Sequence, residues 1–133
     1  MLNARDFLRT AFMTKPSGRA VLCIGDEPIG LNLRCLLLQQ HGLTVISSGS
    51  GYEGIMRLRN EPVDAVILDL DFGGAESALI AGELKREYPG LPVILLATEE
   101  TARAAIAEVD AVVLRSQEFV ALLTTLKKLL KAA

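Results

Sequence analysis

Two short acidic clusters in this sequence each follow an apolar run. Residues 20–24 lead into Asp26, and residues 63–68 lead into Asp69 and Asp71. Apolar runs of this length, bounded by turn residues, are typical of buried parallel strands. We therefore expect these carboxylates to stand at the carboxyl ends of two strands.

The carboxyl ends of parallel strands line the crevice in which open α/β sheets bind ligands. Carboxylates delivered there from two strands, at Asp26 and Asp69, repel each other unless a cation or a proton lies between them. Hard oxygen ligands in a partly hydrated cleft suit Mg²⁺. The pattern is thus the main chemical signal of the chain, and it favours a divalent cation.

Strand and helix patterns alternate along the chain and must position these acids. We expect strands near residues 20–25, 44–47, 65–69, 92–97 and 111–114, with helices near 28–41, 52–60, 75–88, 100–107 and 118–131. Pro28 suits the first position of a helix, and His41 with Gly42 suits its end. This alternation predicts an α/β fold with a parallel sheet that is covered on both faces.

Length and composition indicate one compact domain. The chain has 133 residues, of which 50% are hydrophobic, enough for a core. We expect residues 20–133 to form this domain and residues 1–19 to form an N-terminal extension that could include a short helix. Residues 15–18 include a proline and a glycine, which interrupt regular secondary structure, and this segment separates the extension from the domain.

Charge and hydropathy exclude several classes of partner. A formal net charge of −2 and an isoelectric point near 5.4 argue against broad binding to nucleic acid or to anionic membranes. We see no apolar stretch of membrane-spanning length and no secretory leader. Cys23 lies in a strand pattern and Cys35 among helical leucines, so both are interpreted as small buried hydrophobes. A reduced, cytoplasmic compartment is the expectation that follows.

The order of these elements and acids resembles the receiver domain of two-component response regulators, of the chemotaxis-receiver type. The resemblance runs from about residue 20 to residue 130 and rests on four segments together. Residues 64–69 look like the third strand of the family, and residues 24–28 look like its acidic corner; residues 92–96 and 112–116 are similar to its fourth strand and to its fifth strand with the following loop.

This resemblance implies a flavodoxin-like, doubly wound five-stranded sheet in the order 2-1-3-4-5. It also implies that Asp69 accepts a phosphoryl group from a histidine kinase or a phosphotransfer protein. The metal set that it implies is Asp26, Asp69 and the backbone carbonyl of Asp71, holding Mg²⁺. Arg115 would contact the phosphoryl group in place of the lysine of the family.

The sequence departs from the family at positions that matter for signalling. Gly25 stands where the family has a first acid, so Mg²⁺ should bind weakly. Ala97 replaces the hydroxyl residue that ends the fourth strand, and Val112 replaces the aromatic switch residue of the fifth. The alignment is ambiguous by one residue in the last loop, so Ser116 could occupy the lysine position instead of Arg115.

We therefore interpret the chain as a stand-alone, degenerate receiver domain, a signalling module and not an enzyme. Its output should be protein–protein contact through the helix 100–107, the strand 111–114 and the helix 118–131, since no output domain fits after residue 130. Two alternatives stay open. One is a pseudo-receiver scaffold that never takes phosphate. The other is a different flavodoxin-like ligand-binding protein, although 5% aromatic residues and no tryptophan disfavour a flavin.

Overall fold

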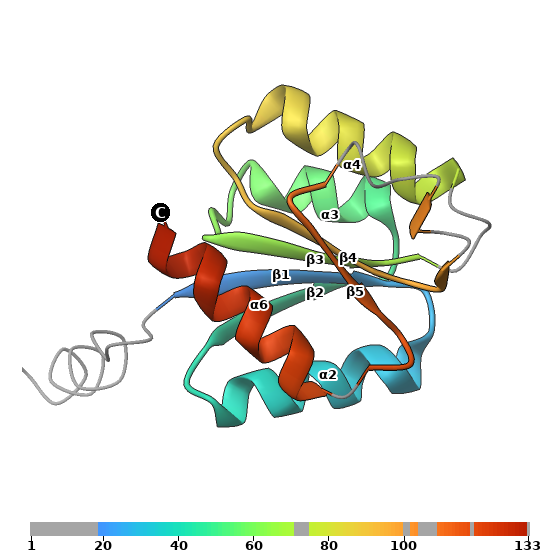
Figure 1. Ribbon diagram of the computed structural model, residues 1–133. Helices are drawn as coiled ribbons and strands as arrows, with labels where there is room; N and C mark the ends of the chain where they lie inside the picture. The colour runs from blue at the N-terminus through green and yellow to red at the C-terminus, as the bar shows by residue number, and fades with distance from the viewer. Residues whose placement is uncertain (1–18, 71–74, 100–101, 104–108, 118, 133) are drawn as a thin grey trace, which may run out of the picture.

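A computed structural model describes residues 19–70, 75–99, 102–103, 109–117 and 119–132 (Figure 1). The N-terminal extension expected at residues 1–19 lies outside the described residues except for its last member. Most of the helix expected at 100–107 lies outside them as well. The domain boundary near residue 20 thus stays a prediction.

The described strands form a single parallel sheet. They are β1 (Ala20–Gly25), β2 (Thr44–Ser48), β3 (Ala65–Asp69), β4 (Val93–Ala97) and β5 (Ala111–Leu114). Their order is β2-β1-β3-β4-β5, and every neighbouring pair is parallel. The predicted order 2-1-3-4-5 is thus confirmed. Parallel neighbours need crossover connections, and the helices between the strands supply them.

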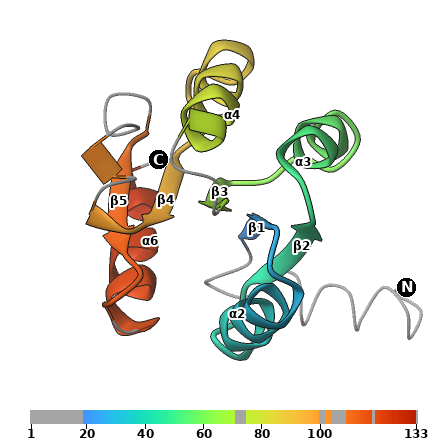
Figure 2. The same cartoon turned by 90° about the vertical axis from the view of Figure 1, so that its right-hand side faces the viewer.

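Helices cover both faces of this sheet. They are α2 (Pro28–Gln40), α3 (Gly51–Leu58), α4 (Ala75–Glu87) and α6 (Phe119–Ala132). In Figure 2, α3 and α4 lie on one face and α2 and α6 on the other. Alternate residues of β1 serve the two cores: Val21 and Cys23 pack toward α2 and α6, while Leu22 and Ile24 pack toward α3 and α4. No helix in the described part of the chain is both long enough and apolar enough to span a membrane.

The start and end of α2 follow the sequence signals. Glu27 is the N-cap, and its carboxylate accepts hydrogen bonds from the backbone N–H of Ile29 at 3.3 Å and of Gly30. Pro28 occupies the first helical position, as predicted. Gly42 has φ of 87°, the left-handed conformation expected just after a helix.

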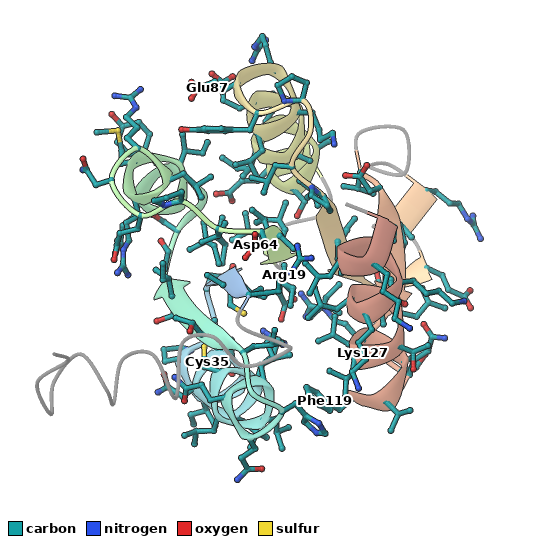
Figure 3. All side chains as sticks on the ribbon, turned by 90° about the vertical axis from the view of Figure 1, so that its left-hand side faces the viewer. Arg19, Cys35, Asp64, Glu87, Phe119 and Lys127 are labelled. Atoms are coloured by element: carbon teal, nitrogen blue, oxygen red, sulfur yellow. The ribbon has the colours of Figure 1, made fainter. Side chains whose placement is uncertain are left out.

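Two further acids stabilise the opposite edge of the sheet, where the strands begin. The Asp64 carboxylate accepts a hydrogen bond from the N–H of Ala20 at 2.7 Å, and Asp110 accepts one from Val93 at 2.7 Å. Asp64 also lies 3.9 Å from the guanidinium of Arg19, as Figure 3 illustrates. These two carboxylates pair with backbone N–H groups where strands begin, which is a structural role. The acids at the carboxyl edge of the sheet therefore remain the candidates for chemistry.

Candidate functional site

Asp69 ends β3 at the carboxyl edge of the sheet. Its four predecessors in the strand are buried, and its side chain is only 14% exposed. In the register of the sheet, Asp69 lies opposite Gly25, the last residue of β1. Asp26 follows Gly25 directly, so the two predicted acids stand at adjacent strand ends.

Two arginines pair with the Asp69 carboxylate. Arg34 Nη2 donates a hydrogen bond to Oδ2 over 2.7 Å, and Arg115 Nη2 donates one to Oδ1. The Arg34 side chain is 16% exposed and that of Arg115 is 33% exposed. Each carboxylate oxygen therefore carries its own guanidinium, and charge-assisted bonds of this kind are the strong ones.

Arg34 reaches this site because it lies on the buried side of α2. Leu31 and Leu38 are buried residues of the same helix, three positions before Arg34 and four after it, so the three share one face. Arg34 is also the single charged residue within α2. The sequence prediction missed it, although a lone arginine on an otherwise apolar helix face was a readable signal.

One donor of this guanidinium has no partner. Nη1 of Arg34 is buried, and it is the one buried side-chain polar atom without a hydrogen bond among the described residues. The same residue lines a cleft of about 360 Å³, whose other charged residues are Glu27, Asp69 and Arg115 and whose apolar residues include Leu33 and Phe119. Arg34 thus lines the cleft and keeps one buried nitrogen without a hydrogen-bond partner, and guanidinium donors are suited to anionic oxygens.

The loop after β5 brings Arg115 to Asp69. The backbone N–H of Arg115 donates to the carbonyl of Ala97 at 2.8 Å, and the Gln117 side chain accepts from the N–H of Leu114 at 2.7 Å. Arg115 thus contacts the candidate phosphoacceptor, whereas Ser116 is exposed. Of the two alternatives for the lysine position, the contact favours Arg115.

The two switch positions of the resemblance are apolar in the fold as well. Ala97 ends β4 with 1% of its surface exposed, and Val112 packs against the same core cluster. Thr98 is exposed, and its carbonyl accepts the N–H of Ala102 at 2.9 Å. This bond spans four residues, as at a helix start, and it agrees with the helix expected to begin near residue 100.

The fit of a divalent cation depends on the arginines. Both oxygens of Asp69 are paired with guanidinium groups, so a metal that binds Asp69 has to share an oxygen with an arginine and lies close to its positive charge. Among the described residues there is no group of three His, Cys, Asp or Glu side chains that could hold a metal ion. Asp71, whose carbonyl was the third expected ligand, lies outside the described residues. The predicted Mg²⁺ site thus stays a prediction.

The two cysteines occupy different environments. Cys23 is buried, as expected, but Cys35 on α2 is only half-buried (Figure 3). A hydrogen bond between the two thiols, together with the nearby charge of Arg34, lowers the pKa of Cys35 to about 7 despite partial desolvation. The same hydrogen bond, with burial, raises the pKa of Cys23. Cys35 is therefore more than a small core residue.

Comparisons with known proteins agree with this geometry. The family model for the response regulator receiver domain matches residues 21–127. The transcriptional regulatory protein GlrR of Escherichia coli is 36% identical over 65% of this chain, which spans only 20% of that protein. Protein PilH of Pseudomonas aeruginosa is 26% identical over 60% of this chain and 68% of its own length.

Solved structures share the fold. The response regulator protein TrrA of Thermotoga maritima, in complex with Mg²⁺–BeF, has a TM-score of 0.75 at 27% identity and covers 84% of this chain and 98% of its own. The receiver domain of NtrX from Brucella abortus has a TM-score of 0.75 at 18% identity, with coverage of 85% and 99%. The second likeness, at that identity, supports the fold alone.

Proposed function

The chain belongs to the response regulator receiver domain family, and on that basis we propose that Asp69 accepts a phosphoryl group from a histidine kinase or a phosphotransfer protein. Receiver domains are signalling domains of two-component systems, and they generally bind Mg²⁺ at the site of phosphorylation. The observation that carries the proposal is the position of Asp69, which ends β3 between the guanidinium groups of Arg34 and Arg115.

The proposed reaction is a phosphoryl transfer. A carboxylate oxygen of Asp69 bonds to phosphorus while the bond from phosphorus to the donor nitrogen breaks, and an acyl phosphate results. The negative charge on the equatorial oxygens needs positive groups nearby. Arg115 supplies a delocalised charge where the family has a lysine, and its planar fork can hold two oxygens of the phosphoryl group.

We further propose that output is protein–protein contact. The surface that we assign to it is formed by β5, α6 and the helix expected at residues 100–107, of which only residues 102–103 are described. Val120 on α6 supports this surface, because its apolar side chain is 65% exposed.

A pseudo-receiver scaffold is the second candidate function. The observation that favours it is that both oxygens of Asp69 are already paired in the absence of phosphate. Gly25, Ala97 and Val112 each lack the group that phosphorylation-dependent relatives of the family use. Under this alternative, Asp69 is a structural anion and its partners bind constitutively.

Intact mass spectrometry distinguishes these two functions. We expect the chain to gain the mass of one phosphoryl group after incubation with acetyl phosphate, and the gain to disappear in Asp69→Asn. Asp64→Asn, at the opposite edge of the sheet, is the matched control and should still gain the group. If the wild-type chain gains nothing, or if Asp69→Asn gains as much, the phosphoacceptor proposal is wrong and the scaffold is favoured.

A further inference from the structure

Arg34 occupies an apolar position and has one donor to spare. It lies on the buried face of α2 between Leu31 and Leu38, where a charged side chain is costly unless it is paired. One of its terminal nitrogens pairs with Asp69 over 2.7 Å, while the other is buried without a partner. Arg34 is thus held in place beside Asp69 and keeps one terminal nitrogen that can still donate a hydrogen bond.

The charged groups in direct contact at Asp69 favour an added anion, although the Glu27 carboxylate also lines the cleft. Two guanidinium groups and one carboxylate meet at Asp69, so these three groups carry a net charge of +1. A phosphoryl group on Asp69 would place oxygens near both arginines. The unused Nη1 of Arg34 gives a second donor to such an oxygen, in the two-bond geometry that guanidinium groups favour with phosphates.

A divalent cation does not fit this arrangement while Arg34 is in place. Arg34 already pairs with Oδ2 of Asp69, so a metal bound to this carboxylate would lie close to the positive charge of the guanidinium. Position 25 supplies no acid either, because the residue there is a glycine. Like charges at one carboxylate repel, so metal and guanidinium compete.

We propose that Arg34 is the resident counter-cation of Asp69, so that this receiver holds a phosphoryl group without a divalent metal. Only the second half of this inference, that the receiver holds a phosphoryl group without a divalent metal, rests on the proposed function. The first half, that Arg34 competes with Mg²⁺ for Asp69, concerns binding and holds whether or not the acid is phosphorylated. Arg34 is in this sense a specificity residue, which selects an anion in place of a metal.

Calorimetric titration with MgCl₂ tests the competition. We expect Arg34→Leu to bind Mg²⁺ about 10-fold or more tightly than the wild-type chain, the range that a change in the surroundings of a metal ligand produces. Leucine suits the site, because its neighbours on this face of α2 are leucines. Arg34→Lys keeps the positive charge and should bind Mg²⁺ as weakly as the wild type.

The matched control is Arg86→Leu, which removes the same charge from the exposed surface of α4, where Arg86 pairs with Glu83. It should leave Mg²⁺ affinity unchanged. Equal Mg²⁺ affinities of wild type and Arg34→Leu, both chains being folded by their amide spectra, would overturn the inference.

Phosphorylation by acetyl phosphate in the presence of EDTA tests the second half of the inference, that the phosphoryl group is held without a divalent metal. Here the Asp69 oxygen bonds to phosphorus, the bond from phosphorus to the acetyl oxygen breaks, and acetate leaves. The wild-type chain should be modified at a similar rate in EDTA and in Mg²⁺, whereas Arg34→Leu should require Mg²⁺. Modification of the wild type only in Mg²⁺ would overturn the inference and leave the proposed function standing. No modification in either would overturn the proposed function, while the titration still decides on Arg34.

Discussion

Asp69 carries one negative charge and contacts two guanidinium groups, and this imbalance governs the behaviour of the site. A partly buried arginine needs an anion, and Asp69 supplies one for both Arg34 and Arg115. The cation that two neighbouring strand-end acids were expected to need is therefore provided, at Asp69, by the chain itself. A phosphoryl group would bring the negative charge that this cluster lacks.

The position of Arg34 also affects its sequence neighbour. The pKa of Cys35 is lowered to about 7, first by the hydrogen bond from the Cys23 thiol and then by the charge of Arg34. The thiolate, which is the reactive form, is thus populated above about pH 7. We expect the rate of iodoacetamide alkylation at Cys35 to rise roughly tenfold between pH 6 and pH 8 and then to level off, as a single titration requires.

Peptide mapping of the alkylated chain measures this rate. Cys35→Ser is the control, and it should leave the buried Cys23 unmodified. Arg34→Leu should move the midpoint to higher pH, because the positive charge that favours the thiolate is gone. A rate that keeps climbing through pH 9, as for an ordinary thiol, would contradict the assignment.

At the scale of the element, α2 is built to carry Arg34 to the carboxyl edge. Its N-cap is Glu27, whose longer side chain bends back to the N–H groups of Ile29 and Gly30. Gly30 makes room for this cap, since a Cβ there would lie 2.8 Å from Oε2 of Glu27. Cap and glycine therefore act as a pair.

Thermal unfolding of four chains tests this pairing. Replacing a glycine by alanine within a helix usually stabilises it by about 0.5–1 kcal/mol. We expect Gly30→Ala to give little or no gain in the wild type, because the methyl group displaces the Glu27 carboxylate. In a Glu27→Ala background, which itself costs about 1 kcal/mol, the same change should give the full gain. Equal effects of Gly30→Ala in the two backgrounds would show that the cap and the glycine are independent.

At the scale of the whole molecule, the site adjoins the surface that would signal, because Leu114 of β5 and Phe119 of α6 line the cleft beside Asp69. Ala97 at the end of β4 has no hydroxyl with which to bind a phosphoryl oxygen, and Val112 is too short and too stiff at χ1 to act as a rotating switch. A ligand shifts a conformational equilibrium only through different contacts with the two states. The absence of both groups predicts a domain with one conformation.

Amide chemical shifts with and without beryllofluoride test this prediction. Shifts near Gly25 and Asp69 should change, while those of Ala97 and of β5 should change little. Large changes across residues 97–115 would contradict it. If they disappeared in Thr98→Val, the hydroxyl one residue beyond β4 would have taken over the coupling.

Much of the fold was determined by the sequence by itself. The strand and helix periodicities are local signals, and so are Pro28 at the start of α2 and Gly42 after its end, because each depends on neighbours within a few residues. The bounds of β1, β3 and β5 accordingly agree with the expected ranges. The placement of Asp26 and Asp69 at one edge of the sheet also follows from the pattern, since acids after parallel strands meet there. That their two strands are neighbours is what the resemblance to the receiver family implied.

Only the tertiary structure decided which cation meets Asp69. Arg34 is 35 residues away in sequence, and Arg115 is 46 residues away. Nothing local to any of these residues specifies the contacts. They arise because α2 packs its buried face on the sheet while β5 ends beside β4, so that two cationic side chains converge on one acid. Charge pairing over such separations depends on packing, and this is why the sequence predicted a cation there but did not identify Arg34.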